Sequence, residues 1–300
     1  MAGIDLNRTS AGVTDLLPKE ISQEIWSNAV EESVIMRSSR SIALPGGGLT
    51  IPIITGDAEA DWVAETDEKP VSDPSVSNKS MTPYKLAVIE TFSDEFRRDL
   101  PALYAELARR LPSALGRKFD NTVLHGTAPG SNFDVLSGSS SVAVDSTDTV
   151  GDLVNALSTV GTAGGDLSHW LLSPQAEGLV MTAKDAAGNF VLLRDVQSST
   201  GAIGNLFGRQ VLKSRHVYNN PTDPGADVIG FAGDFANSAI YGTVEGIKVK
   251  VSDTATVNKG GTQLNLWQRN MFAILCEIEV GFIVRDPSHF VKLTGGTTAP

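Results

Sequence analysis

The sequence predicts an α+β fold suited to self-association, and three observations support this. Residues Ser93–His125 have the apolar spacing of one long helix with a break near Pro101. The segment before it, Thr50–Thr91, is rich in Pro, Asp, Glu, Ser and Gly and has too few apolar side chains to form its own core. Helical and strand-like patterns follow one another through the rest of the chain. A thin arm beside an oversized helix favours a protein that binds copies of itself over an enzyme.

Composition limits the class of protein further. The chain has 300 residues, of which 41% are hydrophobic, so it can bury a sizeable core. Its formal net charge is −11, which argues against a main role in binding nucleic acid, because phosphate neutralisation needs basic residues. No apolar run reaches the roughly 20 residues of a transmembrane helix, and residues 1–17 lack a secretion-signal pattern. We expect synthesis in the cytoplasm and no membrane association.

The first ninety or so residues predict a helix and then a long hairpin. A helix is expected over Pro18–Glu32, with its proline in the first turn. Ser41–Leu44 and Leu49–Ile54 have the pattern of short strands around the turn Pro45–Gly48. Lys85–Phe92 is expected to be the strand that returns along the arm. A hairpin of this kind is too thin to be stable alone, so its natural support is another surface.

The long helix is predicted from one apolar stripe. Ser93 is a suitable N-cap, and Pro101 fits the start of a second helical piece. Pro112 and Gly116 should bend or weaken the helix, and Gly126 should end it. Apolar side chains recur every three or four residues, at Phe96, Leu100, Leu103, Leu107, Leu111, Leu115, Phe119 and Val123.

The second half of the chain predicts a mixed domain. Thr127–Ser146 is expected to be a Gly/Ser-rich connector. Helices are expected over Thr149–Val160 and from Pro174 to about Ala183, with a buried strand, His169–Ser173, between them. Further strands are expected at 205–214, at several places between 228 and 252, and over most of 264–284.

The arm and the long helix carry opposite charge. Two solvated faces would explain this; the alternative is that the arm of one subunit lies across the helix of a neighbour, with charge setting the register. The candidate inter-subunit residues of the arm are Trp62 and six acids, with no base among them: Asp57, Glu59, Asp61, Glu65, Asp67 and Glu68. Those of the helix are six bases interspersed with two acids: Arg97, Arg98, Arg109, Arg110, Arg117 and Lys118.

Motifs for catalysis or cofactor binding are missing from the sequence. The four histidines are scattered without metal-ligand spacing, and there is neither a phosphate-binding GxxxxGK[ST] loop nor a GxSxG nucleophile motif. Cys276, the single cysteine, lies in an apolar run and is expected to be a small buried side chain. We therefore expect no enzyme activity, no cofactor and no metal.

Blocks in a fixed order give the chain a resemblance to a known family. In the first half they are LLPKEISQEIWSNAVEESVIMR, LPGGGLTIPI, ADWVAETDEKPVSDP and MTPYKLAVIETFSDEF. In the second half they are LLSPQAEGLVMTAKDAAGNFVL, GNLFGRQVLKS, GFAGDFANSAIYGTVEGIKVKVS and NMFAILCEIEVGFIVRDPSHFVKLT. Over residues 16–294 the chain resembles the major capsid proteins of tailed bacteriophages.

The resemblance implies the Johnson fold, of the Hong-Kong-ninety-seven type. In that fold residues 1–49 would form an N-terminal arm, and 50–91 an extended hairpin called the E-loop. Residues 92–148 and 252–284 would form the P-domain, with its spine helix and long strands. Residues 149–251 and 285–296 would form the A-domain, with a central sheet and flanking helices. These boundaries follow from the family's pattern.

The resemblance also implies a function and partners. Such proteins assemble as hexamers and pentamers into the icosahedral head of a virion, which encloses double-stranded DNA. A separate scaffolding protein and a portal are expected partners, and the acidic balance suits a container that does not bind its DNA strongly. Many members begin with a scaffolding segment that is later cleaved; here Met1, close to the first matching block, favours a separate scaffolding protein. Lys69, Lys79 and Lys85 could serve a crosslink of the kind some members form, but no partner residue is evident.

Two alternatives stay open at this point. An encapsulin-type compartment resembles the same fold but encloses enzymes, and nucleic acid inside the native particle would separate it from a phage head. A cytosolic α+β enzyme with an unrecognised site would instead be a stable monomer.

Overall fold

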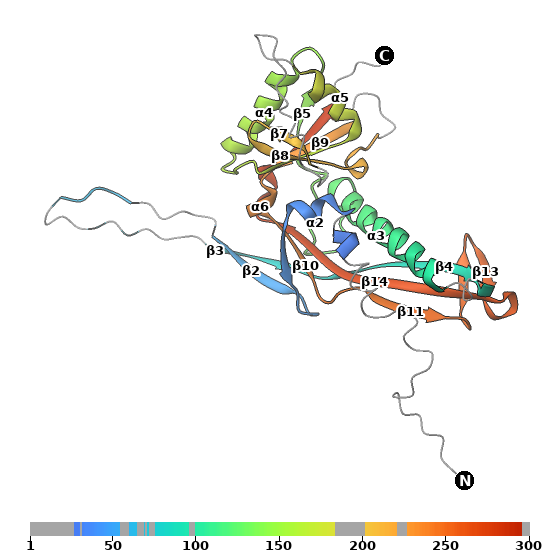
Figure 1. The fold of residues 1–300 in the computed structure, drawn as a ribbon. Helices are drawn as coiled ribbons and strands as arrows, with labels where there is room; N and C mark the ends of the chain where they lie inside the picture. The colour runs from blue at the N-terminus through green and yellow to red at the C-terminus, as the bar shows by residue number, and fades with distance from the viewer. Residues whose placement is uncertain are drawn as a thin grey trace. The chain divides into compact units, whose positions relative to one another are not determined.

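The computed structural model describes residues 27–30, 32–54, 60–64, 69, 71, 76–95, 100–183, 202–220 and 227–295 of the chain. Helices and strands are mixed along it, which confirms the predicted α+β class (Figure 1). The chain divides into two compact units. The first contains the described residues up to Ser33, Lys85–Arg117 and Glu245–Ile278; the second contains Val34–Tyr84, Lys118–Val244 and the described residues from Glu279 onward.

Strand β14 (Met271–Val284) organises the first unit. Its N-terminal half pairs antiparallel with β11 (Lys248–Ser252), from Lys248↔Glu277 to Ser252↔Ala273, and β14 also pairs with β4 (Tyr84–Ser93). Phe92 of β4 stacks on Phe272 with ring centroids 5.7 Å apart. A separate hairpin joins β12 (Thr256–Lys259) to β13 (Thr262–Asn265), followed by the 3-10 turn η3 (Trp267–Arg269). The predicted strand over 264–284 is thus confirmed from Met271 onward.

Helix α3 is the long helix predicted from the apolar stripe. It runs from Leu100 to Leu124, with Pro101 in its first turn, where a missing N–H costs nothing. Its described stripe residues are buried, with exposed fractions of 0–2%: Leu111, Leu115, Phe119 and Val123. Ser93 is the last residue of β4, and its hydroxyl accepts the Glu95 N–H at 3.4 Å, as an N-cap side chain does. Residues 96–99 lie outside the described part, so a helix beginning at Ser93 stays a prediction. Phe96 lies outside the described residues, and the expected bend at Pro112 stays a prediction.

A six-stranded mixed sheet forms the larger part of the second unit. Its order is β5-β15-β9-β6-β8-β7, with β5–β15 and β6–β8 parallel and the other pairs antiparallel. The strands are β5 (Ser140–Val144), β6 (His169–Leu172), β7 (Ala202–Leu206), β8 (Arg209–Lys213), β9 (Val228–Gly233) and β15 (Phe290–Gly295). The predicted connector 127–146 is therefore wrong at its end, since β5 lies within it. Its serines gave no strand signal, and the strand is held by pairing with β15.

Helices α4 (Thr149–Thr162) and α5 (Pro174–Thr182) pack beside this sheet, as predicted (Figure 1). Asp148 caps α4 by accepting the Gly151 N–H at 3.0 Å, and Ser173 caps α5 by accepting the Ala176 N–H at 3.2 Å. The core between helices and sheet is apolar and includes Trp170, whose indole N–H donates to the Leu206 carbonyl at 3.2 Å.

The rest of the second unit is a small sheet with a hairpin beside it. Helix α2 (Val34–Ser38) leads to β1 (Arg40–Ala43), which pairs parallel with β10 (Ala239–Thr243) after the short helix α6 (Phe235–Ser238). Strand β10 pairs antiparallel with the C-terminal half of β14, from Ala239↔Val284 to Thr243↔Val280. The described part of the unit also contains the 3-10 turns η2 (Arg215–Val217) and η4 (Pro287–His289).

The hairpin consists of β2 (Leu49–Ile54) and β3 (Val76–Met81). They pair antiparallel from Leu49↔Met81 to Ile54↔Val76 and run side by side in Figure 1. The prediction that Lys85–Phe92 returns along the arm is therefore wrong: β3 returns, and β4 pairs with β14. Residues 85–92 do form a strand, as predicted. The strand that pairs with β2 was missed because the sequence of β3, VSNKSM, is polar. Of the predicted helix Pro18–Glu32, only residues 27–30 and 32 are described, and these are helical.

Candidate assembly surfaces

The connection between β2 and β3 is exposed wherever the structure describes it. Trp62 is 103% exposed and Val71 is 88% exposed, and Asp61 and Lys69 are exposed as well. A fully exposed indole is unusual, because burying one contributes about 2 kcal/mol or more. These residues fit the prediction of an arm with little support from its own subunit.

The base of the hairpin, in contrast, is packed tightly. Met81, the last residue of β3, is fully buried in a cluster with Leu44 and Ile283. It lies over Gly242 and Gly281, which are directly paired between β10 and β14. A Cβ added at Gly281 would lie 2.7 Å from Met81 Cγ, and one added at Gly242 would lie 2.8 Å from Met81 Sδ. The two glycines thus form a notch in the strand pair that holds the Met81 side chain, and a side chain at either position would occupy this space.

An ion pair ties the same end of the hairpin to the small sheet. Lys79 Nζ lies 2.6 Å from Asp134 Oδ2 and donates to the Val284 carbonyl oxygen, also at 2.6 Å. Asp134 in turn accepts the Val284 N–H at 2.9 Å. Because both side chains are only about a quarter exposed, 29% and 26%, water screens this pair less than a surface pair.

Two further hydrogen bonds extend this anchor into the loop after α3. The Thr82 N–H donates to the Asn132 carbonyl at 3.2 Å, and the Tyr84 hydroxyl donates to the Ser131 carbonyl at 2.6 Å. The hairpin therefore has a fixed base and a connection that, where described, makes little contact with its own chain. Its direction is set by residues 79–84 rather than by its tip.

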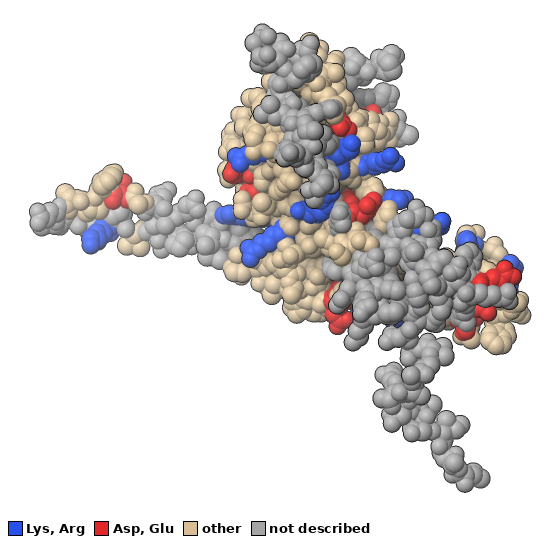
Figure 2. Space-filling model, viewed as in Figure 1, with Lys and Arg blue, Asp and Glu red and all other residues tan. Residues whose placement is uncertain are grey.

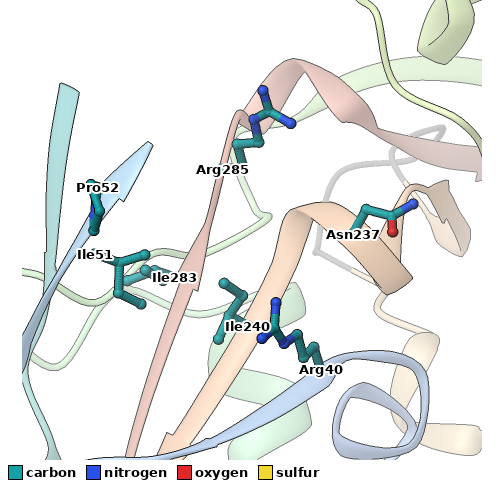
Figure 3. A pocket seen from close by; sticks show the side chains of 7 residues that line it. All are labelled: Arg40, Ile51, Pro52, Asn237, Ile240, Ile283 and Arg285. Carbon is teal, nitrogen blue, oxygen red and sulfur yellow. The ribbon is translucent and has the colours of Figure 1, made fainter. Parts of the chain in front are cut away.

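A cavity of about 300 Å³ lies beside this base. Ile51, Pro52, Ile240 and Ile283 give it an apolar lining. Arg40, Arg285 and Asn237 add polar side chains. Figure 3 shows Ile51 and Ile283 next to each other and the two guanidinium groups well apart.

Of the predicted basic residues of the helix, Arg110, Arg117 and Lys118 are exposed on α3. Arg117 donates to the Ser113 hydroxyl at 3.4 Å. Arg110 lines a cavity of about 370 Å³ in the first unit, together with β4 residues 89–92 and β12 residues 257–259. Arg109 lies in the helix, but its side chain is outside the described part, as are Arg97 and Arg98.

Among the predicted acidic residues, Asp61 is exposed, beside the exposed Trp62. Asp57, Glu59, Glu65, Asp67 and Glu68 lie outside the described residues. Figure 2 shows Lys and Arg interspersed with Asp and Glu on the described part of one face, without a field of a single sign. The pairing of the arm's acids with a neighbour's helix stays a prediction.

The buried titratable groups have structural roles. Asp120 of α3 is fully buried and accepts the N–H groups of Val34 and Ile35, at 2.9 and 3.3 Å, at the start of α2. His216 Nδ1 lies 3.5 Å from the same carboxylate, and the His216 carbonyl lies 3.3 Å from His125 Nε2. Burial lowers the pKa of His125. These contacts join α2, α3 and η2.

Reactive chemistry is not apparent in the described residues. Burial raises the pKa of the Cys276 thiol to about 12, which confirms the predicted small buried side chain. No group of three or more His, Cys, Asp or Glu side chains in the described residues could hold a metal ion. Within the same residues, no helix is both long and apolar enough to cross a membrane.

Sequence reasoning missed most of the hairpin's anchor. Met81, Lys79 and Asp134 stand in polar stretches that give no periodic signal. The one usable clue was a glycine inside each of two strand patterns, Gly242 and Gly281, since such glycines often mark a close approach of another segment. Nothing in the sequence said which segment that would be.

Comparison with known proteins places the chain in a family. The model of the Phage capsid family matches residues 14–295. The chain is 31% identical to the probable major capsid protein gp17 of Mycobacterium phage L5, covering 93% of this chain and 89% of the relative. It is 29% identical to the protein of the same name from Mycobacterium phage D29, with the same coverage.

Solved structures agree with the fold. A chain of Gordonia phage Cozz superposes with a TM-score of 0.69 at 25% identity, covering 99% of both chains. A chain of Mycobacterium phage Adephagia superposes with a TM-score of 0.68 at 22% identity, covering 89% of this chain and 91% of that one. The predicted Johnson fold is confirmed. With a match over nearly its whole length, the chain belongs to the Phage capsid family, whose members are structural proteins and not enzymes.

Proposed function

We propose that this chain is the major capsid protein of a tailed double-stranded DNA phage. It assembles as hexamers and pentamers into an icosahedral head and so becomes part of the virion. The observation that carries the proposal is the match to the family over residues 14–295, joined to 31% identity with a protein named as a probable major capsid protein.

The hairpin supplies a physical means of assembly. Its base is fixed by buried Met81 and by the Lys79–Asp134 ion pair at 2.6 Å, so its direction is defined before assembly. Its described tip presents Trp62 to solvent. A contact between the tip of one subunit and a different surface of the next is heterologous, and such contacts close into rings when the rotation permits. Hexamers and pentamers are rings of this kind.

The charge suits an enclosing role. A net charge of −11 disfavours tight binding of the enclosed DNA, whose phosphates would repel an acidic lining. A separate scaffolding protein and a portal are the further partners we propose, along with synthesis in the host cytoplasm. The division into N-terminal arm, E-loop, P-domain and A-domain given above is part of this proposal.

The test is assembly of the full chain in a bacterial host, followed by light scattering and negative-stain microscopy. We expect shells, rings or tubes. A chain lacking residues 57–73, which keeps β2, β3, Lys79 and Met81, should stay folded, because the described residues of that segment are exposed, but should fail to assemble. A uniform 31.7 kDa monomer, even with scaffolding protein co-expressed, would overturn the proposal.

A further inference from the structure

The cavity beside the hairpin's base has the chemistry of a site for an aromatic side chain with acidic neighbours. Its lining is mainly apolar, from Ile51, Pro52, Ile240 and Ile283. Its volume of about 300 Å³ is at the small end of binding pockets, which suits one large side chain rather than a folded element. The guanidinium groups of Arg40 and Arg285 would favour carboxylates beside that side chain (Figure 3).

The chain carries a segment of matching chemistry at the other end of the same hairpin. Trp62 is fully exposed, so it does not fill this cavity in its own subunit. It follows Asp61 and precedes the partly exposed Val63, and no base lies between Asp57 and Glu68. An apolar ring flanked by acids is complementary to an apolar cavity flanked by arginines.

We propose that Trp62 of one copy inserts into this cavity of a second copy, with Asp61 directed toward the arginines. The inference rests on the proposed function, because it names the surface that receives the hairpin's tip. Cavity and tip are two different surfaces of the chain, so each copy can give its tip to one neighbour and receive the tip of another. When the rotation between neighbours permits, that head-to-tail arrangement closes into a ring in which every subunit has a partner on both sides.

This site differs from the basic face of α3 that the charge pattern suggested. Lys118 and Arg117 are exposed there, and neither of them lines the cavity beside the hairpin's base or the cavity at Arg110. Charge alone contributes little at an exposed surface, whereas filling a cavity with an aromatic side chain is the usual source of affinity.

Cysteine crosslinking in assembled particles shows whether Trp62 contacts the cavity or the basic face of α3 in the neighbouring copy. Val63→Cys combined with Asn237→Cys places one thiol beside Trp62 and one in the cavity's lining. Native Cys276 is buried, with a pKa of about 12, so it does not compete. With a short bismaleimide we expect a ladder of linked chains up to hexamers on a denaturing gel. Val63→Cys with the exposed Ser158→Cys is the matched control and should give none. A ladder from Val63→Cys with Lys118→Cys, and none from the cavity pair, would overturn the inference.

A second variant covers the case in which the double-cysteine chain does not assemble. Trp62→Ala should raise the chain concentration at which particles form by about tenfold or more, the effect of losing one interface anchor. The variant should fold normally because Trp62 is exposed. Val71→Ala, at an 88% exposed site on the same hairpin, should assemble like the unchanged chain. Unaltered assembly of Trp62→Ala would refute the site, while absence of particles from the unchanged chain would instead refute the proposed function.

Discussion

Replacing Met81 with alanine should destabilise the second unit strongly. Met81 is fully buried, and its side chain rests on the backbone of two paired strands at Gly242 and Gly281. Deleting a buried methionine side chain costs about 2–5 kcal/mol, depending on how far the surroundings collapse into the space. Paired strands are stiff and glycines have no side chain to move, so we expect a loss of about 3–5 kcal/mol in the free energy of unfolding.

The complementary substitution, Gly281→Ala, fills the notch instead of emptying it. Its Cβ would lie 2.7 Å from Met81 Cγ and 3.1 Å from the Thr82 carbonyl oxygen. Overpacking of this kind costs about 1–3 kcal/mol. Because the first of these contacts disappears with Met81, the alanine at position 281 should cost less in the Met81→Ala background, with a coupling of about 1–2 kcal/mol. The contact with Thr82 makes the rescue partial.

Urea unfolding of the unassembled chain, followed by circular dichroism, measures all three variants. Val71→Ala is the matched control, since an exposed site should change the free energy of unfolding by no more than about 0.5 kcal/mol. A loss below about 1 kcal/mol for Met81→Ala, or equal costs of Gly281→Ala in both backgrounds, would refute the two-glycine notch as the hairpin's anchor.

Three further outcomes follow from the buried charges and the thiol. Lys79→Met should lower the free energy of unfolding by about 1–2 kcal/mol, because it removes a partly buried ion pair and a hydrogen bond to Val284; Lys79→Arg should lose less. The free energy of unfolding should fall as the pH drops below 6.5 and be regained above it, because the lowered pKa of His125 means that the unfolded chain binds the proton more readily than the folded chain. The variant His125→Gln should flatten this pH dependence, which denaturant titrations at pH 7.5 and 5.5 would measure. Cys276 should resist a thiol reagent in the folded chain and react fully in urea, because its thiol is buried.

Each of these has a result that would contradict it. An unchanged urea midpoint for Lys79→Met would show that the ion pair contributes nothing to the fixed base. Stability that rises on acidification through 6.5 would mean that His125 gains a proton on folding, against its burial. Rapid labelling of Cys276 without denaturant would place β14 in frequent exchange with an open form.

The sequence predicted elements wherever one physical signal dominated. The α3 stripe was correct at Leu111, Leu115, Phe119 and Val123 because a period of three to four fixes one face regardless of context. Helices α4 and α5 were predicted correctly because apolar spacing marks α4 and Pro174 fits the first turn of α5. Their caps, Asp148 and Ser173, were not predicted. The family resemblance, which depends on order along the chain, gave the fold.

The failures came where pairing between distant segments decides the structure. Strand β3 is polar and became a strand because it pairs with β2, while the more apolar β4 pairs with β14 instead. Strand β5 lies in a serine-rich stretch and depends on β15, about 150 residues later. Lys79 reaches Asp134 only because β3 runs back along β2, which brings Lys79 and Met81 to the base of the hairpin. No local propensity encodes such partners.

The candidate surfaces could be predicted only in part. The exposure of Trp62 and Asp61 was predicted from the polar composition of the arm, and the basic side of α3 was predicted from the charge pattern of the helix. The cavity could not be predicted, because Arg40, Ile51, Ile240 and Ile283 come from four strands in two different sheets, and only the tertiary fold brings these strands together. The residues that line a cavity formed by tertiary packing have no regular spacing in the sequence.

The most direct test of the central claim is a cryo-electron microscopy reconstruction of particles formed by the full chain. The account predicts an icosahedral shell of hexamers and pentamers in which the β2–β3 hairpin of each subunit rests on its neighbour. A closed shell whose hairpins fold back on their own subunits would contradict the claim that the hairpin holds the assembly together, and a chain that never forms a symmetric particle would contradict the capsid function itself.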